Sequence, residues 1–108
     1  MELVPVTLDQ LAPESVSDCA LLLHKVARAI SGDDPNFDYN LLQNNGKLAH
    51  QAVFHVHFHV IPKTTRNDGL CLRWDAMEAV AKTDLALLAQ EFAARLAKLD
   101  DMVPEPKK

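Results

Sequence analysis

Residues 54–60 alternate strictly between apolar side chains and histidines, and apolar residues flank them at 52, 53 and 61. Every even position is apolar, and each odd position between Val53 and Ile61 is a histidine. Successive side chains of a β-strand point to opposite faces of a sheet. The alternation therefore predicts a strand over 52–61 with one face packed on a core and with His55, His57 and His59 in one row on the other face.

Periodicity and turn residues predict the remaining elements. Apolar residues at three- and four-residue steps indicate a helix over 13–30, ended by the turn residues at 31–36. A short strand over 37–43 precedes Asn45-Gly46, a strong hairpin signal, so this strand is expected to pair antiparallel with 52–61, which Pro62 then ends. A second amphipathic helix is expected over 82–99. We expect an α+β fold, an antiparallel sheet with two packed helices.

Length and charge limit the classes of function. A chain of 108 residues predicts a single domain over 1–108, with a flexible tail over 102–108. The net charge is -4, so nucleic acid and anionic membranes are not expected partners. No apolar run is long enough to span a bilayer, and no N-terminal signal peptide is evident. Cys19 and Cys71 form no CxxC pair, and a reducing, intracellular compartment is expected.

The histidine row is compatible with two chemistries. His55 and His57 could offer two nitrogens to a zinc ion, but His59 lies about 13 Å along a strand from His55, and the sequence names no third ligand. Alternatively, a neutral imidazole can attack phosphorus and form a covalent intermediate, with neighbouring histidines orienting it and donating protons.

The residues around the row carry a family resemblance. Asn44-Asn45-Gly46, then Gln51, then the run HVHFHVIP from His55 to Pro62 resembles the histidine triad family of nucleotide hydrolases and transferases. The similarity is greatest to its Hint-like nucleoside phosphoramidases, especially the fungal ones. The order of helix, strand, turn, strand and C-terminal helix also agrees with that family.

The resemblance implies catalytic roles for the three histidines. His57 would be the nucleophile on the α-phosphorus of a nucleoside 5'-monophosphate conjugate and would form a nucleotidyl-histidine that water hydrolyses. His59 would hydrogen-bond to phosphate or leaving group, and His55 would orient His57. A histidine at position 59 favours the hydrolase branch, because the transferases carry glutamine there.

The resemblance also implies the binding residues and the partners. Asn44 would contact phosphate or leaving group, Gln51 would hold the phosphate loop, and the backbone N–H groups around Ala52 and Val53 would face phosphate oxygens. The implied substrate is a purine, AMP-like nucleotide conjugate such as adenosine phosphoramidate. No cofactor and no metal are implied; the enzyme would be a homodimer in the cytoplasm and also the nucleus.

Three departures from the family pattern lead to an alternative. Ala52 replaces a hydroxyl residue and His50 replaces the commoner glycine. Strands that precede Met1 in the family are missing, so the domain is expected to be truncated at its N-terminus. The alternative is a catalytically impaired nucleotide-binding or dimerisation module.

Overall fold

The computed structural model describes residues 4–75 and 81–99. The chain divides into two compact units, Met1–Leu72 and Arg73–Lys108. The single domain over 1–108 stays a prediction. The expected tail over 102–108 lies outside the described residues.

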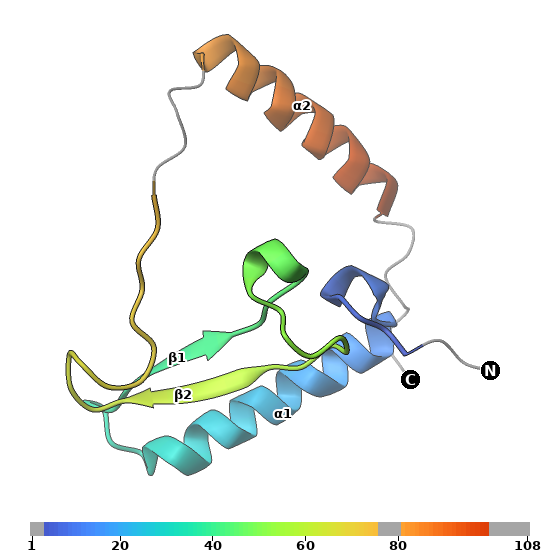
Figure 1. Cartoon of the computed structure of the whole chain (residues 1–108). Helices are drawn as coiled ribbons and strands as arrows, with labels where there is room; N and C mark the ends of the chain where they lie inside the picture. The colour runs from blue at the N-terminus through green and yellow to red at the C-terminus, as the bar shows by residue number, and fades with distance from the viewer. Residues whose placement is uncertain (1–3, 76–80, 100–108) are drawn as a thin grey trace. The chain divides into compact units, whose positions relative to one another are not determined.

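Helix α1 spans Pro13–Ser31 and has the termini that its sequence predicts. Pro13 occupies the first turn, where its missing N–H costs no intrahelical bond. Gly32 ends the helix in the left-handed conformation, with φ 57°, and its N–H donates to the carbonyl of Arg28 at 3.1 Å. The helix lies along strand β2, and its Ala27 is buried (Figure 1).

The sheet contains two antiparallel strands, β1 over Asp38–Leu42 and β2 over His59–Lys63. The register runs from Asp38 opposite Lys63 to Leu42 opposite His59. The first predicted strand and the antiparallel pairing are confirmed. The strand predicted over 52–61 has the wrong bounds, because the observed strand begins at His59 instead of Ala52 and continues to Lys63.

The tight hairpin expected at Asn45-Gly46 is absent, for a physical reason visible in the connection over 43–58. The Asn45 side chain accepts a hydrogen bond from the Leu8 N–H at 2.8 Å, and the Gly46 N–H donates to Gln51 Oε1 at 2.7 Å. A 3-10 helix, η2 over Lys47–Ala49, follows directly. Residues 52–58 therefore lie beyond the end of β1 and outside the ladder.

Pro62 lies inside β2, opposite Tyr39, so the prediction that it ends the strand is also wrong. Proline donates no ladder hydrogen bond and is tolerated in edge strands. Within the described residues the sheet has two strands, so each of them has an unpaired edge.

The N-terminal segment is bound to the rest of its unit. After the extended residues 4–6, a 3-10 helix η1 spans Leu8–Gln10, and the Val6 N–H donates to Gln10 Oε1 at 2.9 Å. The Val56 N–H donates to the carbonyl of Pro5 at 3.0 Å. This segment thus pairs with the residues that lead into β2.

The second unit contains helix α2 over Lys82–Leu99, with the bounds that its periodicity predicts. An ion pair joins Glu91 to Arg95 one turn later, an arrangement that adds modest helix stability. Neither α1 nor α2 is long and apolar enough to cross a membrane. Two helices and an antiparallel sheet agree with the expected α+β class.

Candidate active site

The three histidines of the predicted row lie beside one another. The ring centroids of His55 and His57 are 5.5 Å apart, and those of His57 and His59 are 4.9 Å apart, both in edge-on arrangements. Only His59 belongs to a strand, so the row spans the entry into β2 and its first residue. The structure therefore brings all three predicted catalytic side chains together.

His57 has a defined orientation within this row. Its Nδ1 lies 2.9 Å from the carbonyl oxygen of His55. A carbonyl oxygen only accepts hydrogen bonds, so Nδ1 carries the hydrogen and Nε2 keeps a free lone pair in the neutral ring. This arrangement leaves Nε2 available as a nucleophile.

His55 acts on His57 through its main chain. The imidazole of His55 is exposed, while its carbonyl receives the Nδ1–H of His57. The sequence predicted that His55 orients His57, and the observed contact is one way to do so. A carbonyl oxygen at this position can also stabilise positive charge on the ring.

Gln51 is the buried polar residue of the site, with 4% of its surface exposed. Its Oε1 accepts from the Gly46 N–H at 2.7 Å. Its Nε2 donates to the carbonyl of Val6 at 2.7 Å and to that of Val53 at 3.2 Å. A buried amide must be hydrogen-bonded, and here those bonds hold the loop and the N-terminal segment together.

The other predicted binding residues flank Gln51. Asn44 is half-buried, and its carbonyl accepts from the Gln43 side chain at 3.3 Å. Ala52 and Val53 are exposed. His50 is exposed and adopts a left-handed conformation with φ 66°. Glycine accommodates that conformation without strain, which explains why His50 is an unusual choice there.

A cavity of about 270 Å³ reaches His57. It is formed by one side of α1 and the three residues that precede β2. Its lining consists of Cys19, Leu22, Leu23, Val26, Val56, His57 and Phe58. His57 therefore borders a largely apolar space, where electrostatic interactions are stronger than in water.

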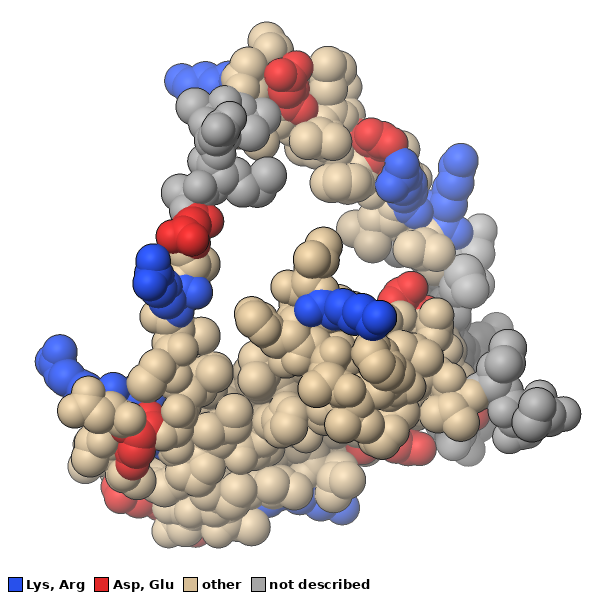
Figure 2. All heavy atoms as spheres, viewed as in Figure 1, with Lys and Arg blue, Asp and Glu red and all other residues tan. Residues whose placement is uncertain are grey.

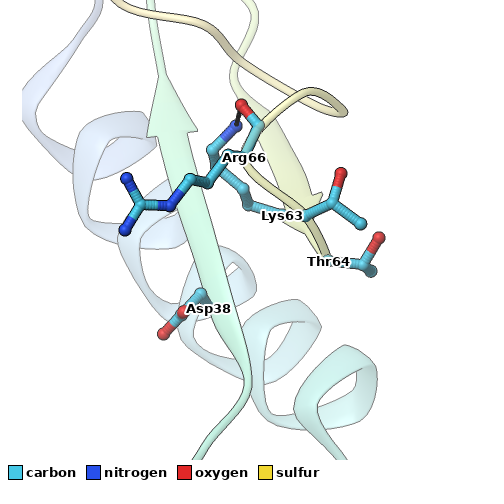
Figure 3. A pocket seen from close by; sticks show the side chains of 5 residues that line it. Asp38, Lys63, Thr64 and Arg66 are labelled. Carbon is cyan, nitrogen blue, oxygen red and sulfur yellow. Dashed lines mark hydrogen bonds between the residues drawn. The ribbon is translucent and has the colours of Figure 1, made fainter.

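A second hollow, of about 260 Å³, lies at the far end of β2 (Figure 3). Lys63 and Arg66 line it together with Asp38. Lys63 Nζ donates to the carbonyls of Arg66 and Asp68, at 3.2 and 2.7 Å, so it holds the following loop. Lys63 lies four positions after His59, about 13 Å along a strand, so this hollow is distinct from the histidine row.

Metal ligation was the other chemistry open to the row. Among residues 4–75 and 81–99, no group of three His, Cys, Asp or Glu side chains could hold a metal ion. Charge is also dispersed: on the face shown in Figure 2, acidic side chains lie between the Lys and Arg side chains. The described site therefore offers imidazoles and backbone groups to a ligand.

Sequence reasoning missed the residues that support the site from the N-terminal side. These residues are Pro5, Val6 and Leu8, which precede the first predicted element. Their partners Gln51 and Asn45 lie 45 and 37 residues away from Val6 and Leu8. No local pattern predicts backbone pairing over such separations.

Comparison with known proteins decides which family these histidines represent. The model of the HIT domain matches residues 5–66. The chain belongs to the HIT domain family. This match includes α1, both strands, the three histidines and the N-terminal segment.

Named HIT relatives agree with that assignment. The chain is 38% identical over 87 residues to adenosine 5'-monophosphoramidase of Schizosaccharomyces pombe, covering 81% of this chain and 62% of the relative. It is 41% identical over 93 residues to adenosine 5'-monophosphoramidase of Saccharomyces cerevisiae, covering 86% of this chain and 54% of the relative. The chain thus spans less than two thirds of the length of these curated relatives.

A solved HIT structure has the same fold. The structure of a histidine triad nucleotide-binding protein from Candida albicans superposes with a TM-score of 0.75 at 36% identity. The match covers 90% of this chain and 70% of the Candida protein. The expected HIT-like α+β fold is therefore confirmed.

Proposed function

We propose that this HIT chain is a nucleotide hydrolase that cleaves nucleoside 5'-monophosphate conjugates of the adenosine phosphoramidate kind. One observation carries the proposal: the Nδ1–H of His57 is held by the His55 carbonyl, which leaves Nε2 free to attack. Relatives with 38% and 41% identity are named adenosine 5'-monophosphoramidases, which supports the substrate class.

The proposed reaction has two displacement steps at phosphorus. Nε2 of His57 donates its lone pair to the α-phosphorus, and the bond from phosphorus to the leaving amine breaks. His59 hydrogen-bonds to phosphate or donates a proton to the departing amine. Water then attacks the nucleotidyl-histidine and gives a proton to the imidazole of His59, the phosphorus–Nε2 bond breaks, and AMP leaves with His57 neutral again.

The first step creates positive charge on His57, and this charge needs to be stabilised. Attack through Nε2 turns the ring into a cation, and the His55 carbonyl oxygen faces the ring at Nδ1. A pre-organised dipole of this kind lowers the energy of the transition state without further reorganisation. Asn44 and the backbone of Ala52 and Val53 are proposed to hold the phosphate, with Gln51 fixing their loop.

The test is AMP release from adenosine 5'-phosphoramidate by the full chain, by His57→Ala and by His24→Ala. His24 lies in α1 and outside the histidine row, so its variant is the matched control. We expect His57→Ala to lower turnover at least about 10³-fold and His24→Ala to leave it near wild type. Equal turnover by wild type and a folded His57→Ala variant would refute the role of His57. Binding of AMP without turnover by wild type would favour the impaired nucleotide-binding module.

We also propose that two copies pair through β1, continuing the sheet across a two-fold axis. Among the described residues β1 has an unpaired edge, and its Leu41 is 56% exposed. Unpaired edges with exposed apolar side chains are natural sites of strand pairing. Leu41→Lys should convert a dimer to a monomer in sedimentation experiments. The fully exposed Leu48, outside the sheet, provides Leu48→Lys as the control; a wild-type monomer would refute the pairing.

A further inference from the structure

We propose that residues Pro5–Leu8, here called the strap, position His57 by fixing the peptide group that joins His55 to Val56. Pro5 supplies the decisive carbonyl, and Asn45 and Gln10 hold the strap in place. This inference rests on the proposed catalytic role of His57, and it assigns a function to a segment outside the histidine row.

One peptide group makes hydrogen bonds in two directions. Its N–H, from Val56, donates to the Pro5 carbonyl at 3.0 Å. Its C=O, from His55, accepts from Nδ1 of His57 at 2.9 Å. A peptide group is planar and trans, so its N–H and C=O point in opposite directions and rotate together. Rotation that breaks the bond to Pro5 therefore also removes the acceptor that holds the His57 ring.

Side-chain hydrogen bonds hold the strap at Val6 and Leu8, which follow Pro5 in the chain. Gln51 Nε2 donates to the Val6 carbonyl at 2.7 Å. The Leu8 N–H donates to Asn45 Oδ1 at 2.8 Å, and the Val6 N–H donates to Gln10 Oε1 at 2.9 Å. Pro5 adds a fixed φ, which reduces the number of conformations available to the strap. Three side chains thus place the Pro5 carbonyl opposite Val56.

The second consequence is electronic. Donation of the Val56 N–H to Pro5 polarises the peptide group, which makes the His55 carbonyl a better acceptor. A better acceptor stabilises the charged form of His57 that arises on attack and keeps the hydrogen on Nδ1. Loosening the strap should therefore reduce kcat, since the affected charge develops in the transition state, and leave KM almost unchanged.

The experiment compares Asn45→Ala, Asn45→Asp and Gln10→Ala in the full chain. Asn45→Asp keeps an oxygen acceptor for the Leu8 N–H, so it is the conservative rescue. Gln10 is exposed, so Gln10→Ala tests the strap at a site of low folding risk. The matched control is Asn67→Ala, which removes an exposed amide side chain from the loop after β2.

Three quantities are measured: hydrogen exchange of the Val56 amide, the Nδ1–H form of His57 by ¹⁵N NMR, and kcat and KM for AMP release. In Asn45→Ala and Gln10→Ala we expect Val56 to exchange about tenfold faster and the Nδ1–H population to fall. We expect kcat to fall about tenfold with KM within about twofold. Asn45→Asp should restore most of each loss, and Asn67→Ala should match wild type.

The proposal is overturned if Val56 exchange is unchanged in both strap variants, or if it accelerates while the His57 ring is unaffected. Loss of turnover that Asn45→Asp does not restore would also overturn it. If wild type releases no AMP, the proposed function fails. The exchange and NMR measurements then still decide whether the strap positions His57.

Discussion

The Nδ1 atom of His57 lies 2.9 Å from the carbonyl oxygen of His55. The two residues are neighbours in the histidine row, and the contact leaves the lone pair of His57 Nε2 free. Its geometry depends on the path of the backbone through residues 52–58, which have no partner strand in the described structure. The stability of that path is therefore open to direct measurement.

Gln51 is the first position to test. Gln51→Ala removes three hydrogen bonds from a buried amide and leaves backbone groups of Val6, Gly46 and Val53 unpaired. We expect the free energy of unfolding to fall by about 2 kcal/mol, measured by urea denaturation. Gln90→Ala, on the exposed surface of α2, is the control and should change it by less than about 0.5 kcal/mol. If Gln51→Ala lowers the free energy of unfolding no more than Gln90→Ala does, Gln51 does not hold the loop.

His50 tests the cost of a strained backbone. Its φ of 66° is left-handed, which disfavours residues with a Cβ. We expect His50→Gly to be more stable than His50→Ala by about 1 kcal/mol, because alanine keeps the strain and glycine removes it. Thermal or urea denaturation of the two variants measures the difference. Equal stabilities would mean that the loop adopts another conformation.

Gly69 and Gly32 form a matched pair. Both have positive φ, 64° and 57°, but a Cβ on Gly69 would lie 2.6 Å from the Pro62 carbonyl oxygen, whereas nothing lies within 4 Å of one on Gly32. Gly32→Ala should cost about 1 kcal/mol for the left-handed backbone alone. Gly69→Ala should cost more, because the backbone of β2 must also move. Denaturation measures both free energies of unfolding. If Gly32→Ala lowers this free energy as much as Gly69→Ala does, the prediction is wrong.

The free energy of unfolding should depend on pH through Asp68. Hydrogen bonds from the Thr64 hydroxyl and the Thr65 N–H lower the pKa of Asp68 from 3.8 to about 2. A lowered folded-state pKa contributes stability that is present above pH 3.8 and is lost as the pH falls toward 2. Carboxyl titration by ¹³C NMR checks the pKa. Thr64→Val removes the hydroxyl donor and should move the titration upward, and an unchanged titration would contradict the assigned cause.

Much of the helical structure could be predicted because its causes are local. Pro13 and Gly32 mark the ends of α1, and the spacing of apolar residues places α2 at the bounds observed. The alternation around His57 predicts that the three histidines lie in one row, and the structure places their rings beside one another. The upstream Asn44 and Gln51 directed the interpretation toward phosphate chemistry.

The second strand was placed wrongly because alternation specifies which side chains share a face and does not specify a partner. A ladder needs two strands, and β1 ends at Leu42, opposite His59. Asn45-Gly46 did not form a tight hairpin, because Asn45 and Gly46 bond to Leu8 and Gln51 instead.

By itself, the sequence determined the helices, the histidine row and the family signature, since each depends on residues close together in the chain. Only the tertiary structure decided how His57 is held. That depends on the peptide group between His55 and Val56, which bonds to Pro5 in a distant part of the chain. Backbone hydrogen bonds of this kind carry no side-chain signature, so they become visible only once the chain is folded.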